Sequence, residues 1–160
     1  MSVENRRCLA VIRVSGRVGI DKEREYVFKL AHLTRRNHAI LIEDTSSNLG
    51  SIRKIKDYAT WGEVSADTIL LLLKKRGMLE GYKKLTESYI KEVLGYTSTQ
   101  ELSKAIYDLK IRVNELPKVK PIFRLHPPTK GFHGSTKKPY PEGELGYRGE
   151  AINQLIARMV

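Results

Sequence analysis

The chain has 160 residues and one tryptophan, and 41% of its residues are hydrophobic. This size and composition predict a packed globular protein with one substantial core, and they exclude a chain that is disordered throughout. Its 29 Lys and Arg residues outnumber its 18 Asp and Glu residues, so the formal net charge is +11. Charge of this size, spread along the whole chain, predicts an anionic partner such as a phosphate backbone and argues against an enzyme for small acidic substrates.

The single cysteine and the short apolar runs limit the redox chemistry and the location of the protein. Cys8 alone excludes an internal disulfide and a cysteine-based zinc cluster, and its place at the head of an apolar strand predicts a buried thiol. The polar residues 4–7 precede only a short apolar run, unlike a signal peptide. The apolar run at residues 69–73 is far shorter than the roughly 20 residues that a membrane span needs. We therefore expect a soluble cytoplasmic protein, alone or in a soluble complex, with no membrane partner.

The first half of the chain alternates predicted strands with predicted helices. Three apolar segments rich in β-formers predict strands, the last of them glycine-broken and edge-like: residues 9–14, 39–42 and 59–64. Apolar residues at helical spacing predict three helices: residues 22–36, a segment from the polar residues 43–47 to about residue 58, and residues 66–76. We take residues 1–77 as one RNA-binding core.

Residues 78–116 are predicted to form a small helical satellite beside the sheet. One helix is expected over residues 86–94. The next begins at Ser98, which has Glu101 three positions later, the spacing of a capping box. At the end of the chain, residues 150–160 predict a helix that docks on the core through an apolar stripe: Ile152, Leu155, Ile156 and Met159.

Between these parts, residues 117–149 predict a basic extended arm. Its central stretch, residues 121–141, contains no Asp or Glu and several Pro and Gly residues. The cations of this stretch are Arg124, Lys130, Lys137 and Lys138. Prolines and glycines disfavour regular structure and like charges repel, so we expect an irregular segment that folds only against a polyanion. The arm therefore predicts a nucleic-acid partner.

Ten residues are predicted to contact RNA because they are basic or lie among basic residues: Arg17, Arg53, Lys54, Lys56, Arg124, Lys130, His133, Lys137, Lys138 and Arg148. Arg17 lies in the loop 16–19 between a predicted strand and a predicted helix. This loop is either a plain turn or a phosphate contact. It lacks the Lys-Ser/Thr sequence of a nucleotide-binding loop, which argues against nucleotide catalysis.

Other side chains that could carry chemistry receive structural interpretations. The adjacent Glu43 and Asp44 would point to opposite faces of a strand, which favours helix capping over acid–base catalysis. His126 and His133 lie in a cationic segment without a third ligand, so no metal site is expected. Trp61 is interpreted as core or sheet-edge packing, with base stacking as the alternative. We predict no catalytic residues, no cofactor and no small-molecule substrate.

A set of short motifs, in order along nearly the whole chain, resembles one family. The motifs are the opening strand with the Gly16–Gly19 loop, Ile42-Glu-Asp-Thr45, Thr60-Trp-Gly62, Lys75-Arg-Gly77, Phe123-Arg-Leu125 and the closing segment Ile152–Met159. They resemble the L-thirty family of large-subunit ribosomal proteins, whose eukaryotic relatives are called L-seven. Bacterial members resemble only the first part of the chain. The satellite, the arm and the C-terminal helix resemble archaeal and eukaryotic forms, and the lack of a long basic N-terminal extension favours an archaeal source.

The resemblance implies an α+β fold, with a ferredoxin-like β-α-β-α-β arrangement in which helices cover one face of an antiparallel sheet. It also implies a non-catalytic constituent of the large (50S) ribosomal subunit that binds 23S ribosomal RNA and supports translation. Further candidate partners are 5S ribosomal RNA and neighbouring large-subunit proteins. The alternative is a free-standing RNA-binding regulator, which would present aromatic residues on exposed strands. Residues 9–14 and 39–42 contain none, which favours the ribosomal interpretation.

Overall fold

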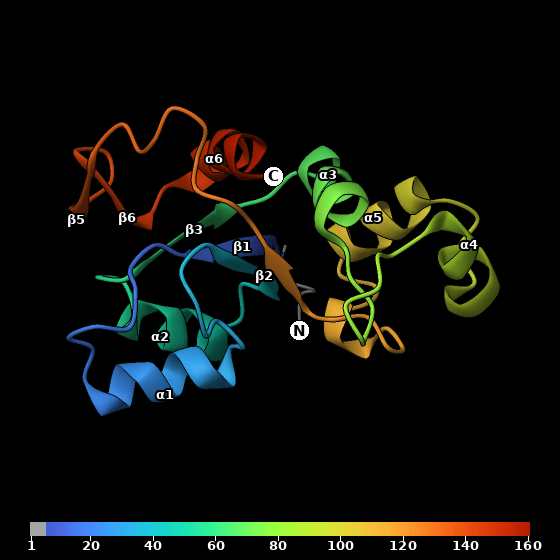
Figure 1. The fold of residues 1–160 in the computed structure, drawn as a ribbon, viewed down its shortest axis with the longest axis horizontal. Helices are drawn as coiled ribbons and strands as arrows, with labels where there is room; N and C mark the ends of the chain where they lie inside the picture. The colour runs from blue at the N-terminus through green and yellow to red at the C-terminus, as the bar shows by residue number, and fades with distance from the viewer. Residues whose placement is uncertain (1–5) are drawn as a thin grey trace.

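The computed structural model describes residues 6–160 of the chain (Figure 1). Strands and helices alternate in its first half. The strands are β1 (Cys8–Arg13), β2 (His38–Glu43) and β3 (Ala59–Glu63), and the helices are α1 (Lys22–Leu30), α2 (Ser46–Lys54) and α3 (Ala66–Arg76). These are the six elements predicted from the sequence, although α1 ends at Leu30 instead of residue 36.

The strands form one sheet, in the order β4-β2-β1-β3-β6-β5, where β4 is Ile122–Arg124, β5 is Ser135–Pro139 and β6 is Gly143–Tyr147. β1 is antiparallel to both β2 and β3, and Val11 lies opposite Ile40 on one side and Trp61 on the other. β4 is antiparallel to β2. β6 runs parallel to its neighbours β3 and β5. The sheet is therefore antiparallel around β1, as expected, and becomes parallel only at β6.

The position of β3 corrects one prediction. Residues 59–64 were expected to form an edge strand, but β3 lies between β1 and β6. The glycine that suggested an edge, Gly62, is present for another reason. A Cβ atom at this position would lie 2.0 Å from the carbonyl oxygen of Gly149. Glycine is therefore needed because another backbone segment approaches β3 closely.

Helices cover both faces of the sheet, with α1 and α2 on one side and α6 on the other (Figure 1). Successive residues of β1 point to opposite faces, and all of them are buried. Leu9 and Val11 belong to one apolar cluster with side chains of α1 and α2. Ala10 and Ile12 belong to another, with side chains of α3, α5 (Thr99–Tyr107) and α6 (Ile152–Met159). The α+β class and the ferredoxin-like core with its helices α1 and α2 on one face are therefore confirmed, and the second half of the chain covers the other face.

The satellite lies to the right of the sheet in Figure 1, where α5 packs beside α3. Before α5 come α4 (Glu87–Tyr89) and the π-helix η1 (Ile90–Leu94), and after it comes the short 3-10 helix η2 (Val113–Glu115). The hydroxyl of Ser98 accepts the N–H of Glu101 at 3.2 Å, as predicted for the start of α5. The carboxylate of Glu101 accepts the N–H of Thr97 at 2.9 Å. The side chain of Glu101 therefore bonds to the N–H of Thr97, one residue before the N-cap Ser98, and not to the N–H of Ser98 as in the predicted capping box.

The segment 117–149 is more regular than the sequence predicted. It contributes β4 to one side of the sheet and β6 and β5 to the other. Phe123 and Leu145 are buried, and Glu144, just beyond the acid-free stretch, accepts the N–H of Gly134 at 2.9 Å. Apolar burial and an internal carboxylate thus let this segment fold on the protein itself. The division of the chain into four parts stays a prediction: 1–77, 78–116, 117–149 and 150–160.

The C-terminal helix α6 follows a 3-10 turn, η3 (Gly149–Ala151), and packs against β3 and α3. Its apolar stripe is at most 2% exposed: Ile152, Leu155, Ile156 and Met159. The N–H of His126 donates to the carbonyl oxygen of Met159 at 3.0 Å, so the segment after β4 is joined to the end of this helix. Within residues 6–160, none of the helices combines the length and apolar character of a membrane span.

Candidate nucleic-acid interface

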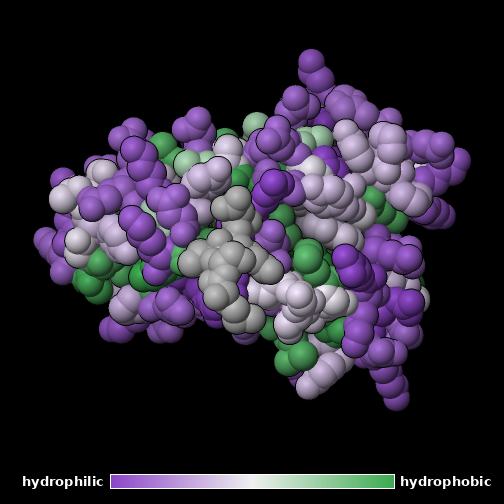
Figure 2. Space-filling model, turned by 180° about the vertical axis from the view of Figure 1, so that it is seen from behind, coloured by the Kyte–Doolittle hydropathy of each residue, from purple (hydrophilic) through white to green (hydrophobic). Residues whose placement is uncertain are grey.

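Most of the predicted RNA contacts lie on the surface, which is largely hydrophilic on the face shown in Figure 2. Five ion pairs occur within residues 6–160: Arg6–Glu43, Arg7–Glu63, Arg24–Asp21, Arg112–Glu43 and Arg148–Glu144. Only Arg148 among the ten predicted contacts takes part in one of these pairs. Of the other nine, Arg124 is half-buried and the rest are exposed. Within the described chain their charges are not neutralised by carboxylates, so they can attract an anionic ligand.

Arg148 is the exception among the predicted contacts, and the structure corrects its role. Its side chain is buried, and its Nη2 atom lies 2.7 Å from a carboxylate oxygen of Glu144. Its Nε atom donates to the hydroxyl of Thr60 at 2.8 Å. Burial raises the pKa of Glu144, but the N–H of Gly134 and the guanidinium of Arg148 together lower it by more. The pKa of Glu144 therefore lies below its ordinary value. Arg148 therefore fastens β6 to β3 and is not exposed to an external ligand.

Several of the exposed residues come together at one end of the sheet. The N–H groups of Val14 and Ser15 donate to the carbonyl oxygen of Tyr58 at 2.9 and 3.0 Å, so the loop after β1 lies beside the turn after α2. β5 lies toward the same side in Figure 1. These segments carry most of the predicted contacts: Arg17, Arg53, Lys54, Lys56, Lys137 and Lys138. The loop after β1, the end of α2 with the turn that follows it, and β5 thus form one basic end of the sheet.

A buried arginine fixes the loop that carries Arg17. Arg13 is 1% exposed and donates to the carbonyl oxygens of Leu33 at 2.7 Å and Ser15 at 3.0 Å. Arg17 donates from Nε to the carbonyl oxygen of Thr34 at 3.0 Å. Burial, and then the charge of Arg17, lower the pKa of Arg13, but a guanidinium stays protonated in proteins. The loop that carries Arg17 and the chain at residues 33–34 are therefore joined by hydrogen bonds from these two guanidinium groups, which hold Arg17 at the surface.

The structure also assembles a second basic region, which we call the Tyr82 cluster and define as Tyr82, Lys120, Arg124 and Arg35. The Nζ atom of Lys120 lies 4.2 Å from the centroid of the Tyr82 ring, and the Cζ atom of Arg124 lies 4.7 Å from it. A hydrogen bond to Arg124, and then the charges of Lys120, Arg124 and Arg35, lower the pKa of Tyr82. None of the three cations belongs to an ion pair within residues 6–160.

His38 lies beside the Tyr82 cluster without adding to its charge. Burial, and then the charges of Arg124 and Arg35, lower the pKa of His38, so its ring is neutral at neutral pH. Four buried side-chain atoms of the described chain have no hydrogen-bond partner, and three of them lie here: His38 Nδ1, Arg124 Nε and Asn37 Oδ1. The polar groups at this corner are therefore not fully satisfied by the protein itself.

Three members of the Tyr82 cluster were not predicted: Tyr82, Lys120 and Arg35. The adjacent arginines at 35 and 36 were a usable signal, but they were placed inside the first helix. That helix ends at Leu30, and His32, with φ 61°, turns the chain into a loop. Tyr82 and Lys120 are far apart in the sequence, so only the folded chain brings their side chains together.

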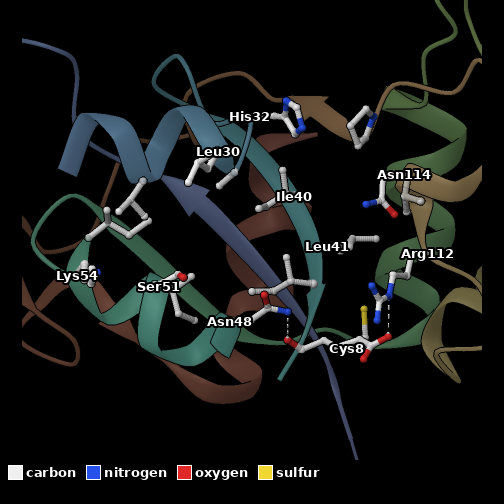
Figure 3. Close-up of a pocket in the computed structure, with 18 of the residues that line it drawn as sticks. Cys8, Leu30, His32, Ile40, Leu41, Asn48, Ser51, Lys54, Arg112 and Asn114 are labelled. Atoms are coloured by element: carbon white, nitrogen blue, oxygen red, sulfur yellow. Dashed lines mark hydrogen bonds and ion pairs between the residues drawn. The ribbon is translucent and has the colours of Figure 1, made fainter. Parts of the chain in front are cut away.

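A cavity of about 630 Å³ lies between α1, α2, β2 and residues 106–114, and its lining is mainly apolar (Figure 3). Cys8 lies at one end of it, and the thiol is buried as predicted. Burial, and then the charges of Glu43 and Asp44, raise the pKa of Cys8 to about 12, so the thiol stays protonated and is a poor nucleophile. No group of three His, Cys, Asp or Glu side chains in residues 6–160 could hold a metal ion.

Comparison with known proteins agrees with the resemblance seen in the sequence. Residues 9–59 match the family described as ribosomal protein L30p/L7e. The chain is 48% identical over 147 residues to the large ribosomal subunit protein uL30 of Methanopyrus kandleri, covering 91% of this chain and 99% of that relative. It is 43% identical over 150 residues to the protein of the same name from Archaeoglobus fulgidus, covering 94% of this chain and 98% of the relative. With such similarity along nearly the full length, the chain belongs to the ribosomal protein L30p/L7e family, whose members are structural and not enzymes.

Proposed function

We propose that this protein is a structural constituent of the large ribosomal subunit and that it binds 23S ribosomal RNA. The relatives from Methanopyrus kandleri and Archaeoglobus fulgidus carry the name of a large-subunit protein. In this role the protein acts in the cytoplasm, as part of the ribosome, and supports translation. Its further partners are 5S ribosomal RNA and neighbouring large-subunit proteins.

The observation that carries the proposal is the set of surface cations without carboxylate partners. Most of them lie at the basic end of the sheet or in the Tyr82 cluster, on segments that the fold holds in place. Phosphate groups bound by such cations release condensed counterions, which gives affinity without reading a base sequence. The proposed contacts are the predicted residues other than Arg148, joined by the members of the Tyr82 cluster: Arg17, Arg53, Lys54, Lys56, Lys130, His133, Lys137, Lys138, Arg124, Arg35, Lys120 and Tyr82.

A salt titration of binding to transcribed 23S ribosomal RNA tests this proposal. If about six phosphates are contacted, log K should fall against log salt with a slope of roughly −4 to −5. A nearly flat titration would contradict an interface made of phosphate contacts. The same titration with 5S ribosomal RNA measures whether that RNA is bound with comparable affinity. Co-sedimentation with large subunits that lack the protein then tests assembly itself, and a chain that stays in the supernatant would contradict the ribosomal role.

A further inference from the structure

Tyr82 stands at the tip of a tight hairpin. Met78 forms an antiparallel bridge with Lys84, and the N–H of Leu79 donates to the carbonyl oxygen of Lys83 at 2.6 Å. Gly81 and Tyr82 have φ values of 78° and 63°, both in the left-handed region. Glycine and asparagine are favoured at such positions, whereas a tyrosine is strained there by its Cβ atom. The geometry of the turn therefore does not explain the tyrosine.

Core packing does not explain Tyr82 either. Tyr82 is 64% exposed, although the hairpin beneath it is well fixed. The N–H of Glu80 donates to the carbonyl oxygen of Lys118 at 2.9 Å, and the N–H of Lys120 donates to that of Met78 at 2.9 Å. A second backbone segment thus supports the hairpin from the side. The protein presents a large aromatic ring to solvent on a rigid base.

Lys120 and Arg124 each lie over this ring, and Tyr82 is nevertheless 64% exposed. Their cationic groups are 4.2 and 4.7 Å from the ring centroid, and neither has a carboxylate partner within residues 6–160. If Lys120 and Arg124 served only to attach the hairpin by cation–π contacts, a single cation would suffice, and nothing would require the ring to be exposed. An exposed ring in contact with two cations that have no carboxylate partner combines the two elements that bind single-stranded nucleic acid, a stacking surface and phosphate contacts.

We propose that Tyr82 is a stacking platform for an unpaired nucleobase of the bound RNA and that Lys120 and Arg124 bind the phosphates beside that base. This inference rests on the proposed function, because it assigns one contact within the RNA interface. It also goes further, since phosphate contacts alone read neither strandedness nor bases. A base that is paired in a duplex does not expose its face, so the site selects a loop, a bulge or a single-stranded end.

The test compares variants of Tyr82 for affinity to transcribed 23S ribosomal RNA. Tyr82→Phe keeps the ring, and Tyr82→Asn removes it while suiting a left-handed turn. Tyr82→Asn should weaken binding by about 5- to 150-fold, the effect of losing one stacked base, and Tyr82→Phe should bind within about twofold of the original protein. The melting temperature of Tyr82→Asn should stay close to the original, because asparagine tolerates positive φ. Tyr107→Leu, which removes another exposed tyrosine, is the matched control and should bind normally.

A second probe separates stacking from phosphate binding. Two RNA oligonucleotides of equal length are compared, one with bases and one with an abasic backbone. The loss caused by Tyr82→Asn should appear with the first and vanish with the second. A loss of equal size with both would overturn the stacking role, and so would unchanged affinity of Tyr82→Asn for the ribosomal RNA. If the original protein fails to bind ribosomal RNA at all, the proposed function itself fails, which is a different result.

Discussion

Two tyrosine–arginine pairs in this chain look alike in geometry and differ in their surroundings. Arg148 lies with its guanidinium 5.3 Å from the ring centroid of Tyr140, and Arg124 lies 4.7 Å from that of Tyr82. Arg148 also has the carboxylate of Glu144 at 2.7 Å, whereas Arg124 belongs to no ion pair of the described chain. The first arginine is buried and the second is half-buried.

The difference shows which arginines remain available to a ligand. A buried guanidinium with an internal carboxylate has its charge satisfied, so it serves to join strands. A cation near the surface with no carboxylate has a charge that an external phosphate can satisfy. Both arginines follow or end a strand, so their residue type and their place at a strand end do not distinguish them. The position of one glutamate does.

The largest expected effect is the loss of the buried pair. Arg148→Ala would leave the carboxylate of Glu144 buried without its cation, and such a loss costs about 3–5 kcal/mol of unfolding free energy. Arg124→Ala removes a cation–π contact near the surface and should cost under about 1 kcal/mol. Urea unfolding of both variants measures these values. Equal losses for the two would show that the internal carboxylate does not set the roles of the arginines.

A second prediction concerns RNA binding by the other pair. Replacing Lys120 and Arg124 together by Gln removes two phosphate contacts, so the slope of log K against log salt should become less steep by about 1 to 2. The melting temperature should change little, because both side chains lie near the surface. Lys91→Gln, an exposed lysine of the satellite, is the control and should leave the slope unchanged. An unchanged slope in the double variant would remove the Tyr82 cluster from the interface.

Much of the fold could be predicted because local patterns decide it. The alternation of strands and helices over residues 8–76 follows from apolar periodicity, and Ser98 begins α5 because a hydroxyl accepts an orphan N–H group. The central position of β3 could not be predicted, since it depends on pairing with β6, which is distant in sequence. The need for glycine at position 62 is also non-local, because it arises from the close approach of the backbone at Gly149.

The candidate site divides in the same way. Exposed lysines such as Lys137 and Lys138 could be predicted, since a charged residue in a polar segment has no reason to be buried. The burial of Arg148 could not, because it depends on the pairing of β6 with β3, where Arg148 meets Thr60, a residue distant in the sequence. The Tyr82 cluster joins the hairpin after α3 to the segment before β4. A contact between segments so far apart leaves no local pattern.

A third prediction concerns Glu144, the carboxylate that pairs with Arg148. The pKa of Glu144 in the folded protein lies below its ordinary value of 4.5, because its hydrogen bond from Gly134 and its pairing with Arg148 outweigh the opposing effect of burial. The carboxylate therefore stabilises the fold at any pH above 4.5, and this contribution is lost as the pH falls below 4.5 through the folded pKa. Glu144→Gln should be less stable than the original at neutral pH and should lose less stability on acidification. Urea midpoints measured between about pH 6 and pH 3 give both curves. Parallel curves would contradict this account.

The smallest effect is expected at His38, beside the other arginine. Burial and the charges of Arg124 and Arg35 hold its pKa below the ordinary value of 6.5, so the folded protein keeps the ring neutral. The unfolded chain takes up the proton first as the pH falls, so the stability is fully present above 6.5 and declines below it until the folded pKa is reached. His38→Gln should remove this decline, while His133→Gln, at an exposed site, should keep it. Because a bound phosphate would offset the surrounding positive charge, the decline should also shrink when the protein is held on RNA. A decline that persists unchanged in His38→Gln would show that another group titrates in this range.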